Sequence, residues 1–210
     1  MSADETGRRD RKRQQTLGHL ASIGRRLFDR NGFEAVTMEQ IAAEADVAKG
    51  TLYNHFPTKE AVLAYAIHQE LGQDLRKLTT LFKPDSEFAS GVAALLDAHA
   101  QWCEAHREYL TPYLRFRFMD IQAPAPDTDS TGPNDLVDVY ALLITNSQRT
   151  GKLRKDLDAR HLATLFHHLC LGALLRWLQA SKLDLRRELA AVVDLFVHGA
   201  AAAKQSGKRG

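Results

Sequence analysis

The sequence contains only two cysteines, Cys103 and Cys170, whose positions fit neither a metal knuckle nor a disulfide framework. Such sparse cysteine usage is typical of a reducing compartment, where buried free thiols are the ordinary form. No run of eighteen apolar residues is present, and the N-terminal residues lack the apolar core of a signal peptide. We therefore expect a cytoplasmic protein with no membrane partner.

Sequence motifs for catalysis are also missing. The chain has no glycine-rich loop for phosphates, no nucleophile elbow and no paired His-Glu motif for a catalytic metal. An enzyme is the rival hypothesis from another functional class, but it has no visible apparatus here. We predict neither enzymatic activity nor a cofactor.

The formal net charge is only +2, so overall composition does not indicate a nucleic-acid partner. Position is more informative, because five of the six residues from position 8 to position 13 are cationic, namely Arg8, Arg9, Arg11, Lys12 and Arg13. A cluster of this kind is typical of a basic arm. We predict that residues 1–15 form a flexible basic arm.

The rest of the chain carries a helical pattern. Apolar residues recur three and four positions apart almost everywhere, and no segment alternates with a period of two. These features predict an all-α fold. We expect one helical domain over residues 16–60, joined by a long helix to a second helical domain over residues 61–203, and a tail over residues 204–210.

Local signals place helix ends in the first domain. Gly32 fits the left-handed position that ends a helix beginning near Thr16, and Phe33 then falls where it can contact Phe28. The next helix starts at Thr37, which forms a capping box with Gln40 three residues later.

The segment DVAKGTLYNHF, residues 46–56, contains a glycine in the first turn of a short helix, where glycine costs about 1 kcal/mol relative to alanine. Leu52 and Phe56 form the buried side of this helix, and Gly50 and Asn54 lie nearly opposite. The glycine is explained if the helix backbone must come close to a partner.

Two helices joined by a sharp turn at residues 45–47, with Asp46 in the left-handed conformation, form a helix-turn-helix, whose second helix enters the DNA major groove. Such helical pairs also occur in α proteins of other kinds, so spacing alone leaves a purely structural interpretation open.

Residues 20–63 resemble the DNA-binding domain of the TetR family of transcriptional regulators. The matching residues follow one another in family order: Leu27-Phe28, Asn31-Gly32-Phe33, Thr37, Ile41-Ala42, Val47, Lys49-Gly50-Thr51-Leu52-Tyr53, His55-Phe56 and Lys59-Glu60. Asp46 stands where the family usually has a turn glycine, and Ala48 stands where it usually has a capping serine. These two departures bear on DNA affinity.

The resemblance also implies which side chains contact DNA. Phosphate contacts are implied for Thr37, Thr51, Tyr53, His55 and Lys59. Base-edge or close backbone contacts are implied for Lys49, Gly50, Glu39 and Asn54. A helical protein-interaction module that has lost DNA contact is the alternative for this domain.

The last two helices look like those that pack against their copies in TetR-family dimers. The final helix is apolar on two faces and therefore needs two packing partners. We predict a homodimer that binds a palindromic operator, with a thick core within one chain as the alternative. The predicted interface residues are Leu189, Val192, Val193, Phe196 and Ala200.

Aromatic residues concentrate between Trp102 and Phe118, with Phe166 and Trp177 later in the chain. Together they suggest a largely apolar pocket for a small hydrophobic effector. Core packing is the alternative for each of them. The predicted effector-binding residues are Trp102, Tyr109, Tyr113, Phe116 and Phe166.

A metal-responsive regulator is a further alternative. His99, Cys103 and His106 share one helical face, and imidazole with thiolate suits zinc or copper, although three ligands on one helix rarely close a tetrahedral site. The leading prediction is a ligand-responsive homodimeric DNA-binding regulator, and the family resemblance implies repression as the common mode.

Overall fold

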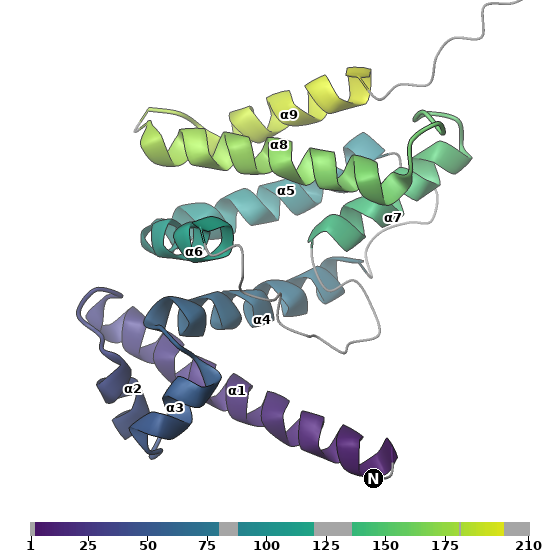
Figure 1. Cartoon of the computed structure of the whole chain (residues 1–210). Helices are drawn as coiled ribbons and strands as arrows, with labels where there is room; N and C mark the ends of the chain where they lie inside the picture. Colours follow the sequence, from purple (N-terminus) through teal and green to yellow (C-terminus); the bar gives the residue numbers. More distant parts are fainter. Residues whose placement is uncertain (1–2, 80–87, 120–135, 181, 200–210) are drawn as a thin grey trace, which may run out of the picture. The chain divides into compact units, whose positions relative to one another are not determined.

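The computed structural model describes residues 3–79, 88–119, 136–180 and 182–199. Within these ranges the chain forms nine α-helices and no β-strand, which confirms the predicted all-α fold (Figure 1). No helix in the described ranges has both the length and the apolar character that crossing a membrane requires. The described residues group into two compact units.

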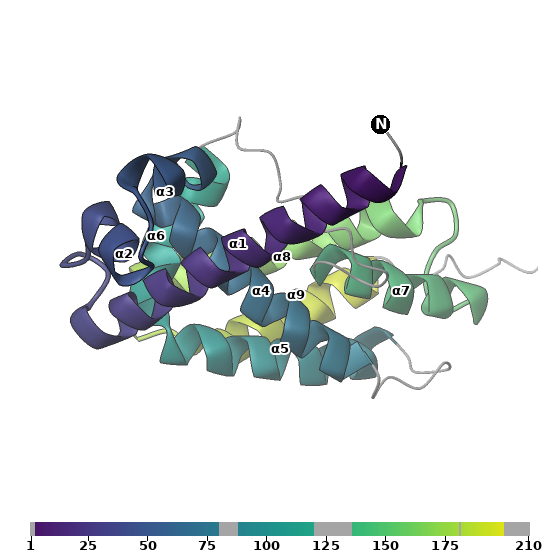
Figure 2. The same cartoon turned by 90° about the horizontal axis from the view of Figure 1, so that it is seen from below.

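The first unit contains the described residues up to Leu71 and those from His106 onward to the end of α6. Its helices are α1 (Ala3–Asn31), α2 (Met38–Glu44), α3 (Lys49–His55), the first part of α4 (Lys59–Thr79) and α6 (Arg107–Met119). Helices α2 and α3 lie beside the C-terminal half of α1, whose first turns extend past them (Figures 1 and 2).

Helix α1 begins at Ala3, well before the start near Thr16 that the sequence predicts. The stretch predicted to be a flexible arm is therefore helical from Ala3, and this part of the prediction is corrected. Arginine, lysine and glutamine are strong helix formers, and no proline interrupts residues 3–16. Once the packed part of α1 is formed, extension by further turns costs little.

The core of the first unit comes from the apolar stripes of its helices. Leu20, Ile41, Leu52 and Leu63 are fully buried. Gly24 lies at the closest approach of α1 to α4, because a Cβ atom at this position would be only 2.4 Å from Cγ1 of Val62. The glycine thus sets the spacing of these two helices.

The predicted C-terminal end of α1 and the predicted start of α2 are confirmed. Gly32 has φ of 81°, and the Phe33 ring centre lies 5.1 Å from that of Phe28. The Oγ1 atom of Thr37 accepts from the Gln40 N–H at 3.2 Å, and the Gln40 Oε1 atom accepts from the Thr37 N–H at 2.8 Å.

Helix α6 is tied to α1 by Tyr109. The Tyr109 hydroxyl donates to Oδ1 of Asp29 at 2.9 Å, and its ring centre lies 4.5 Å from the guanidinium carbon of Arg25. Arg25 is buried and donates to Asp29 at 2.8 Å and to Glu70 of α4 at 2.9 Å. Two carboxylates offset the desolvation of the guanidinium, so a polar network joins α1, α4 and α6.

The second unit contains the end of α4 from Gly72, α5 (Phe88–Ala105), α7 (Leu136–Arg149), α8 (Ala159–Gln179) and α9 (Leu185–Gly199). Helix α8 contacts both α7 and α9, and α5 also contacts both α7 and α9. At the centre, Phe166 is fully buried among three rings whose centres lie 4.8 to 5.1 Å away, those of Phe88, Tyr140 and Phe196.

Candidate nucleic-acid interface

A tight turn joins α2 to α3. Asp46 has φ of 53°, in the left-handed region that the sequence predicts for it. The Val47 N–H donates to the Ala42 carbonyl at 3.0 Å, which closes the turn. A residue other than glycine in this conformation costs about 1 kcal/mol or more. Within the described residues the Asp46 carboxylate makes neither a hydrogen bond nor an ion pair, so its own side chain does not offset that cost.

The start of α3 has no side-chain cap, because Ala48 occupies the N-cap position. The two sides of α3 are as predicted. Leu52 and Phe56 are buried and anchor the helix to the first unit, whereas Gly50 and Asn54 are exposed.

Nothing in the packing of the first unit requires a glycine at position 50. Apart from its chain neighbours and the backbone of its own helix, no heavy atom of the described residues lies within 4 Å of the position that its Cβ would occupy, and its φ is not positive. A larger residue at this position would fit the isolated unit and would favour the helix by about 1 kcal/mol. Because glycine has no side chain, the backbone of α3 is accessible at this exposed position, and we call the surface around Gly50 and Asn54 low in this sense. Such a surface suits a partner that must approach the helix backbone closely.

Polar side chains surround this low surface. Thr51 and Tyr53 are exposed, and His55 is half-buried on the side nearer the core. Thr37, at the N-cap of α2, is also exposed. The Thr51 and Tyr53 hydroxyls and the His55 imidazole are placed to donate to phosphate oxygens, whereas the Thr37 hydroxyl interacts with the Glu39 carboxylate and would have to leave it. These DNA contacts stay predictions.

Lys49 and Glu39 form an exposed ion pair between α3 and α2, with Nζ and Oε1 separated by 3.5 Å. A backbone N–H at the start of α2 and the Lys49 ammonium hold the pKa of Glu39 below its ordinary value. Exposed pairs of this kind are weak. Lys49 can therefore leave Glu39 and bind another anion, such as a DNA phosphate, with little loss of free energy.

Lys59 is engaged inside the first unit. Its Nζ donates to the carbonyls of Phe33 at 2.9 Å and Glu34 at 3.3 Å, and lies 4.4 Å from the Phe33 ring centre. Lys59 thus fastens α4 to the loop that follows α1. Two of its three ammonium protons are used there, and Nζ also lies 3.6 Å from Oε2 of the exposed Glu34 carboxylate. The predicted phosphate contact would therefore have to replace this carboxylate at the third proton.

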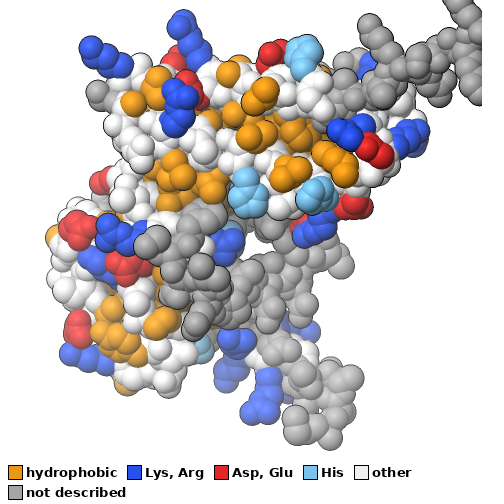
Figure 3. All heavy atoms as spheres, turned by 45° about the horizontal axis from the view of Figure 1, so that its top comes forward, with side chains coloured by type: hydrophobic (Ala, Val, Ile, Leu, Met, Phe, Trp, Pro, Cys, Tyr) orange, Lys and Arg blue, Asp and Glu red, His pale blue; other side chains and the backbone are white. Residues whose placement is uncertain are grey.

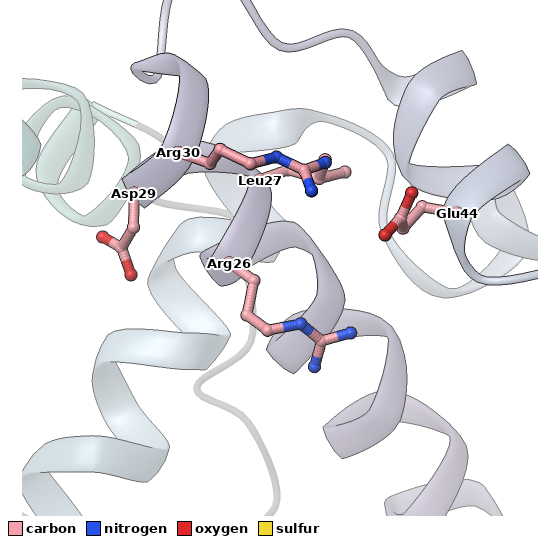
Figure 4. A pocket seen from close by; sticks show the side chains of 5 residues that line it. All are labelled: Arg26, Leu27, Asp29, Arg30 and Glu44. Atoms are coloured by element: carbon pink, nitrogen blue, oxygen red, sulfur yellow. The ribbon is translucent and has the colours of Figure 1, made fainter.

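An open cleft of about 420 Å³ lies on the first unit between α1 and α2. In Figure 4, Arg30 and Leu27 extend across it toward Glu44, whereas Asp29 points to the opposite side of α1. The cleft is lined mostly by charged side chains: Arg26, Asp29, Arg30 and Glu44, with Leu27. It contains none of the predicted effector-binding residues.

The predicted effector residues are divided between the units. Trp102 and Phe166 belong to the second unit, and Tyr109, Tyr113 and Phe116 to the first. Phe166 and Tyr109 are at most 2% exposed and pack within their own units, which favours the core-packing alternative for these two. The other three are half-buried and stay predicted contacts.

The candidate metal ligands do not come together. Nε2 of His99 lies 3.5 Å from Sγ of Cys103, whereas the His106 ring stacks on Tyr109. Among the residues that the structure describes, no three His, Cys, Asp or Glu side chains are placed to hold a metal ion. Burial lowers the pKa of His99 to about 4 and raises the pKa of the Cys103 thiol to about 12, which disfavours the thiolate.

The predicted dimer residues are partly used inside the second unit. Leu189 and Phe196 are buried, Phe196 against Phe88 and Phe166. Leu189 and Val193 line a groove of about 260 Å³ between α5 and α9. This corrects the prediction for Leu189 and Phe196, because these side chains complete the core of their own chain.

Val192 is half-buried, and Ala200 lies outside the described residues. The exposed apolar surface of α8 and α9 consists instead of leucines that are 39% to 64% exposed, and hydrophobic side chains gather on this face (Figure 3). These leucines, named here the α8–α9 patch, are Leu165, Leu169, Leu175 and Leu195.

Residues 22–66 match the model of the bacterial regulatory proteins of the tetR family. The repressor KstR of Mycolicibacterium smegmatis is 29% identical over 183 residues, which cover 81% of each chain. KstR of Mycobacterium tuberculosis is 27% identical over 178 residues, 81% of this chain and 76% of that protein. The HTH-type regulator YerO of Bacillus subtilis is 39% identical over 56 residues, and the match spans 19% of that protein.

Solved structures share the fold. FadR of Thermus thermophilus, a TetR-family repressor in complex with lauroyl-CoA, has a TM-score of 0.71 and 23% identity over 92% of this chain and 100% of its own. SmeT, the repressor of an efflux pump of Stenotrophomonas maltophilia, has a TM-score of 0.54 and 22% identity over 90% of this chain and 91% of its own. The helix-turn-helix region of this chain, residues 22–66, therefore belongs to the tetR family of bacterial regulatory proteins, and the relatives that match most of the chain are HTH-type transcriptional repressors.

Proposed function

We propose that this chain is a homodimeric repressor that binds a palindromic operator through α2, the turn and α3, and that a small hydrophobic effector releases it. The observation that carries the proposal is Gly50. It is exposed, meets open space on its own unit, and lies among polar side chains at the start of a helix whose other side is buried.

Contact with DNA then divides into two kinds. The low surface at Gly50 and Asn54 lets the α3 backbone approach base edges in the major groove. The hydroxyls of Thr37, Thr51 and Tyr53 position the helix by donating to phosphates. Lys49 leaves its weak pair with Glu39 and contacts a phosphate or a base edge.

Dimerisation is supported by the α8–α9 patch. Four exposed leucines on two neighbouring helices form an apolar surface that a second copy of the chain would cover. A two-fold dimer presents two α3 helices, and the operator would therefore contain two inverted half-sites about one helical turn apart.

The effector class is supported by proteins of the same fold. The FadR proteins of Thermus thermophilus and Bacillus subtilis hold lauroyl-CoA and stearoyl-CoA, and SmeT holds triclosan. All three ligands carry a large apolar part. An effector of this chemistry would cause release by binding the DNA-incompetent dimer more tightly than the competent one.

A selection of bound sequences from a random pool of DNA duplexes tests this function. We expect the pool to converge on an inverted repeat. Lauroyl-CoA is then added to the complex as the first effector probe, with free coenzyme A as the matched control. A pool that stays unenriched after repeated rounds contradicts operator binding. Enrichment without release by acyl thioesters contradicts only the acyl effector.

A further inference from the structure

The first turns of α1 are a cationic rod outside the helix-turn-helix. Helix α1 begins at Ala3, and Leu17 is the first buried residue among those of this helix whose side chains the structure describes. Before that point the five cationic side chains between positions 8 and 13 are all exposed. Figure 2 shows this part of α1 extending beyond α2 and α3.

The cationic side chains are available to a partner. None of the five forms a salt bridge with another described side chain. At 100° per residue, Arg8, Arg9, Lys12 and Arg13 occupy an arc of about 140°. They therefore present one continuous basic face, with Arg11 beside it.

The rod is fixed to the DNA-binding unit. Gln14 accepts a hydrogen bond from the Tyr65 hydroxyl of α4 at 2.8 Å, and Leu17 and Leu20 are buried in the core that also contains Leu52 of α3. The basic face thus holds a set position relative to α3.

The side-chain types in the first turns of α1 indicate which class of partner they can bind. Residues 7–13, GRRDRKR, contain no apolar side chain. A helix that binds a membrane surface needs an apolar face, and a protein-docking helix needs apolar anchors, so both partners fit poorly. A polyanion recognised through its phosphates needs neither.

We propose that the N-terminal turns of α1, through Arg8, Arg9, Arg11, Lys12 and Arg13, form a second DNA contact that binds backbone phosphates beside each operator half-site. This inference rests on the proposed DNA binding. The six residues rise about 7.5 Å along the helix axis, and one DNA strand carries a phosphate about every 3.4 Å, so each protomer meets about two phosphates. A dimer then meets about four.

The test compares the salt dependence of duplex binding. In the first variant all five cations are replaced by glutamine, which keeps helix propensity. The matched control replaces five exposed cations of the second unit by glutamine: Arg149, Lys152, Lys155, Lys182 and Arg187. Binding to a labelled duplex of mixed sequence, about 40 base pairs long, is followed by fluorescence anisotropy at several KCl concentrations.

We expect the slope of log affinity against log salt to become shallower by about 3 to 4 in the first variant, because each lost phosphate contact contributes about 0.9. The control should keep the wild-type slope. A change smaller than about 2 in the first variant overturns the inference. An equal change in the control also overturns it, because net charge would then be the cause.

The outcomes separate the two proposals. If the wild type binds and Lys49→Ala weakens binding while the five-fold variant keeps its slope, only the second contact fails. If the wild type binds no duplex, both fail. Binding to phosphatidylglycerol vesicles that the five-fold variant loses, with an unchanged duplex slope, assigns the rod to membranes and overturns the DNA contact.

Discussion

The hydroxyl of Tyr109 on α6 donates a 2.9 Å hydrogen bond to the carboxylate of Asp29 on α1. These residues are 80 positions apart in the sequence, and the bond fastens α6 to the unit that carries α2 and α3. We expect Tyr109→Phe to keep the ring stacked on Arg25 but to lower the free energy of unfolding by about 1 kcal/mol. Urea denaturation measures this difference. Tyr53→Phe is the control, because Tyr53 is 44% exposed, and an equal loss in both variants contradicts the role of the bond.

Gly24 sets the approach of α1 to α4. In Gly24→Ala the added Cβ would meet Cγ1 of Val62 at 2.4 Å, so we expect a loss of about 1 to 3 kcal/mol of stability. Trimming the neighbour in Gly24→Ala/Val62→Ala should cost less than the sum of the two single changes. Thermal unfolding of all three variants checks this, and strictly additive losses would show that the two side chains do not meet.

His99 makes stability depend on pH. Burial lowers its folded-state pKa to about 4 from an ordinary value near 6.5, so between these values the unfolded chain binds a proton that the folded chain does not. Stability therefore falls as pH drops from 6.5 to 4, by up to about 3 kcal/mol from this residue. Urea titrations from pH 7 to pH 4 should show a smaller fall for His99→Gln. Parallel curves for the two proteins contradict a buried neutral imidazole.

The α8–α9 patch predicts a dimer that a charge disrupts. Leu169→Glu or Leu195→Glu should convert the dimer to monomer in sedimentation velocity, because the carboxylate would be buried against the second copy. Leu142→Glu on α7 is the matched control, since Leu142 is 46% exposed but lies outside the patch. Dissociation in the control alone, or dimers in all variants, would place the interface elsewhere.

Sequence signals that act over a few residues predicted the first unit well. The capping box at Thr37, the left-handed Gly32 and Asp46, and the buried and exposed sides of α3 each depend on neighbours within one or two turns. The start of α1 was missed although Ser2, followed three residues later by Glu5, is a capping-box pattern directly before Ala3. Further turns also add cheaply to a helix whose later part is packed, so the first buried residues do not mark its start.

Relations between distant segments were not predictable. The final helix has two apolar faces, and only the packing of Phe196 against Phe88 and Phe166 shows which one completes the core. The partner of Tyr109 is on α1, and no pattern within α6 indicates it. A signal for the α8–α9 patch was also overlooked. Leu165 and Leu169 are four residues apart and share one side of α8, about 100° around the helix from the side that holds the buried Phe166 and Cys170.

Gly50 offers a substitution that separates stability from DNA binding. Gly50→Leu places its side chain in open space on a regular helix, so thermal stability should stay the same or rise by up to about 1 kcal/mol. The same side chain would stand between the α3 backbone and the major groove. In an anisotropy titration against the selected duplex, we expect Gly50→Leu to bind at least about tenfold more weakly than the wild type, about 1.4 kcal/mol, while remaining folded. Wild-type affinity in this stable variant would contradict DNA recognition through this surface of α3.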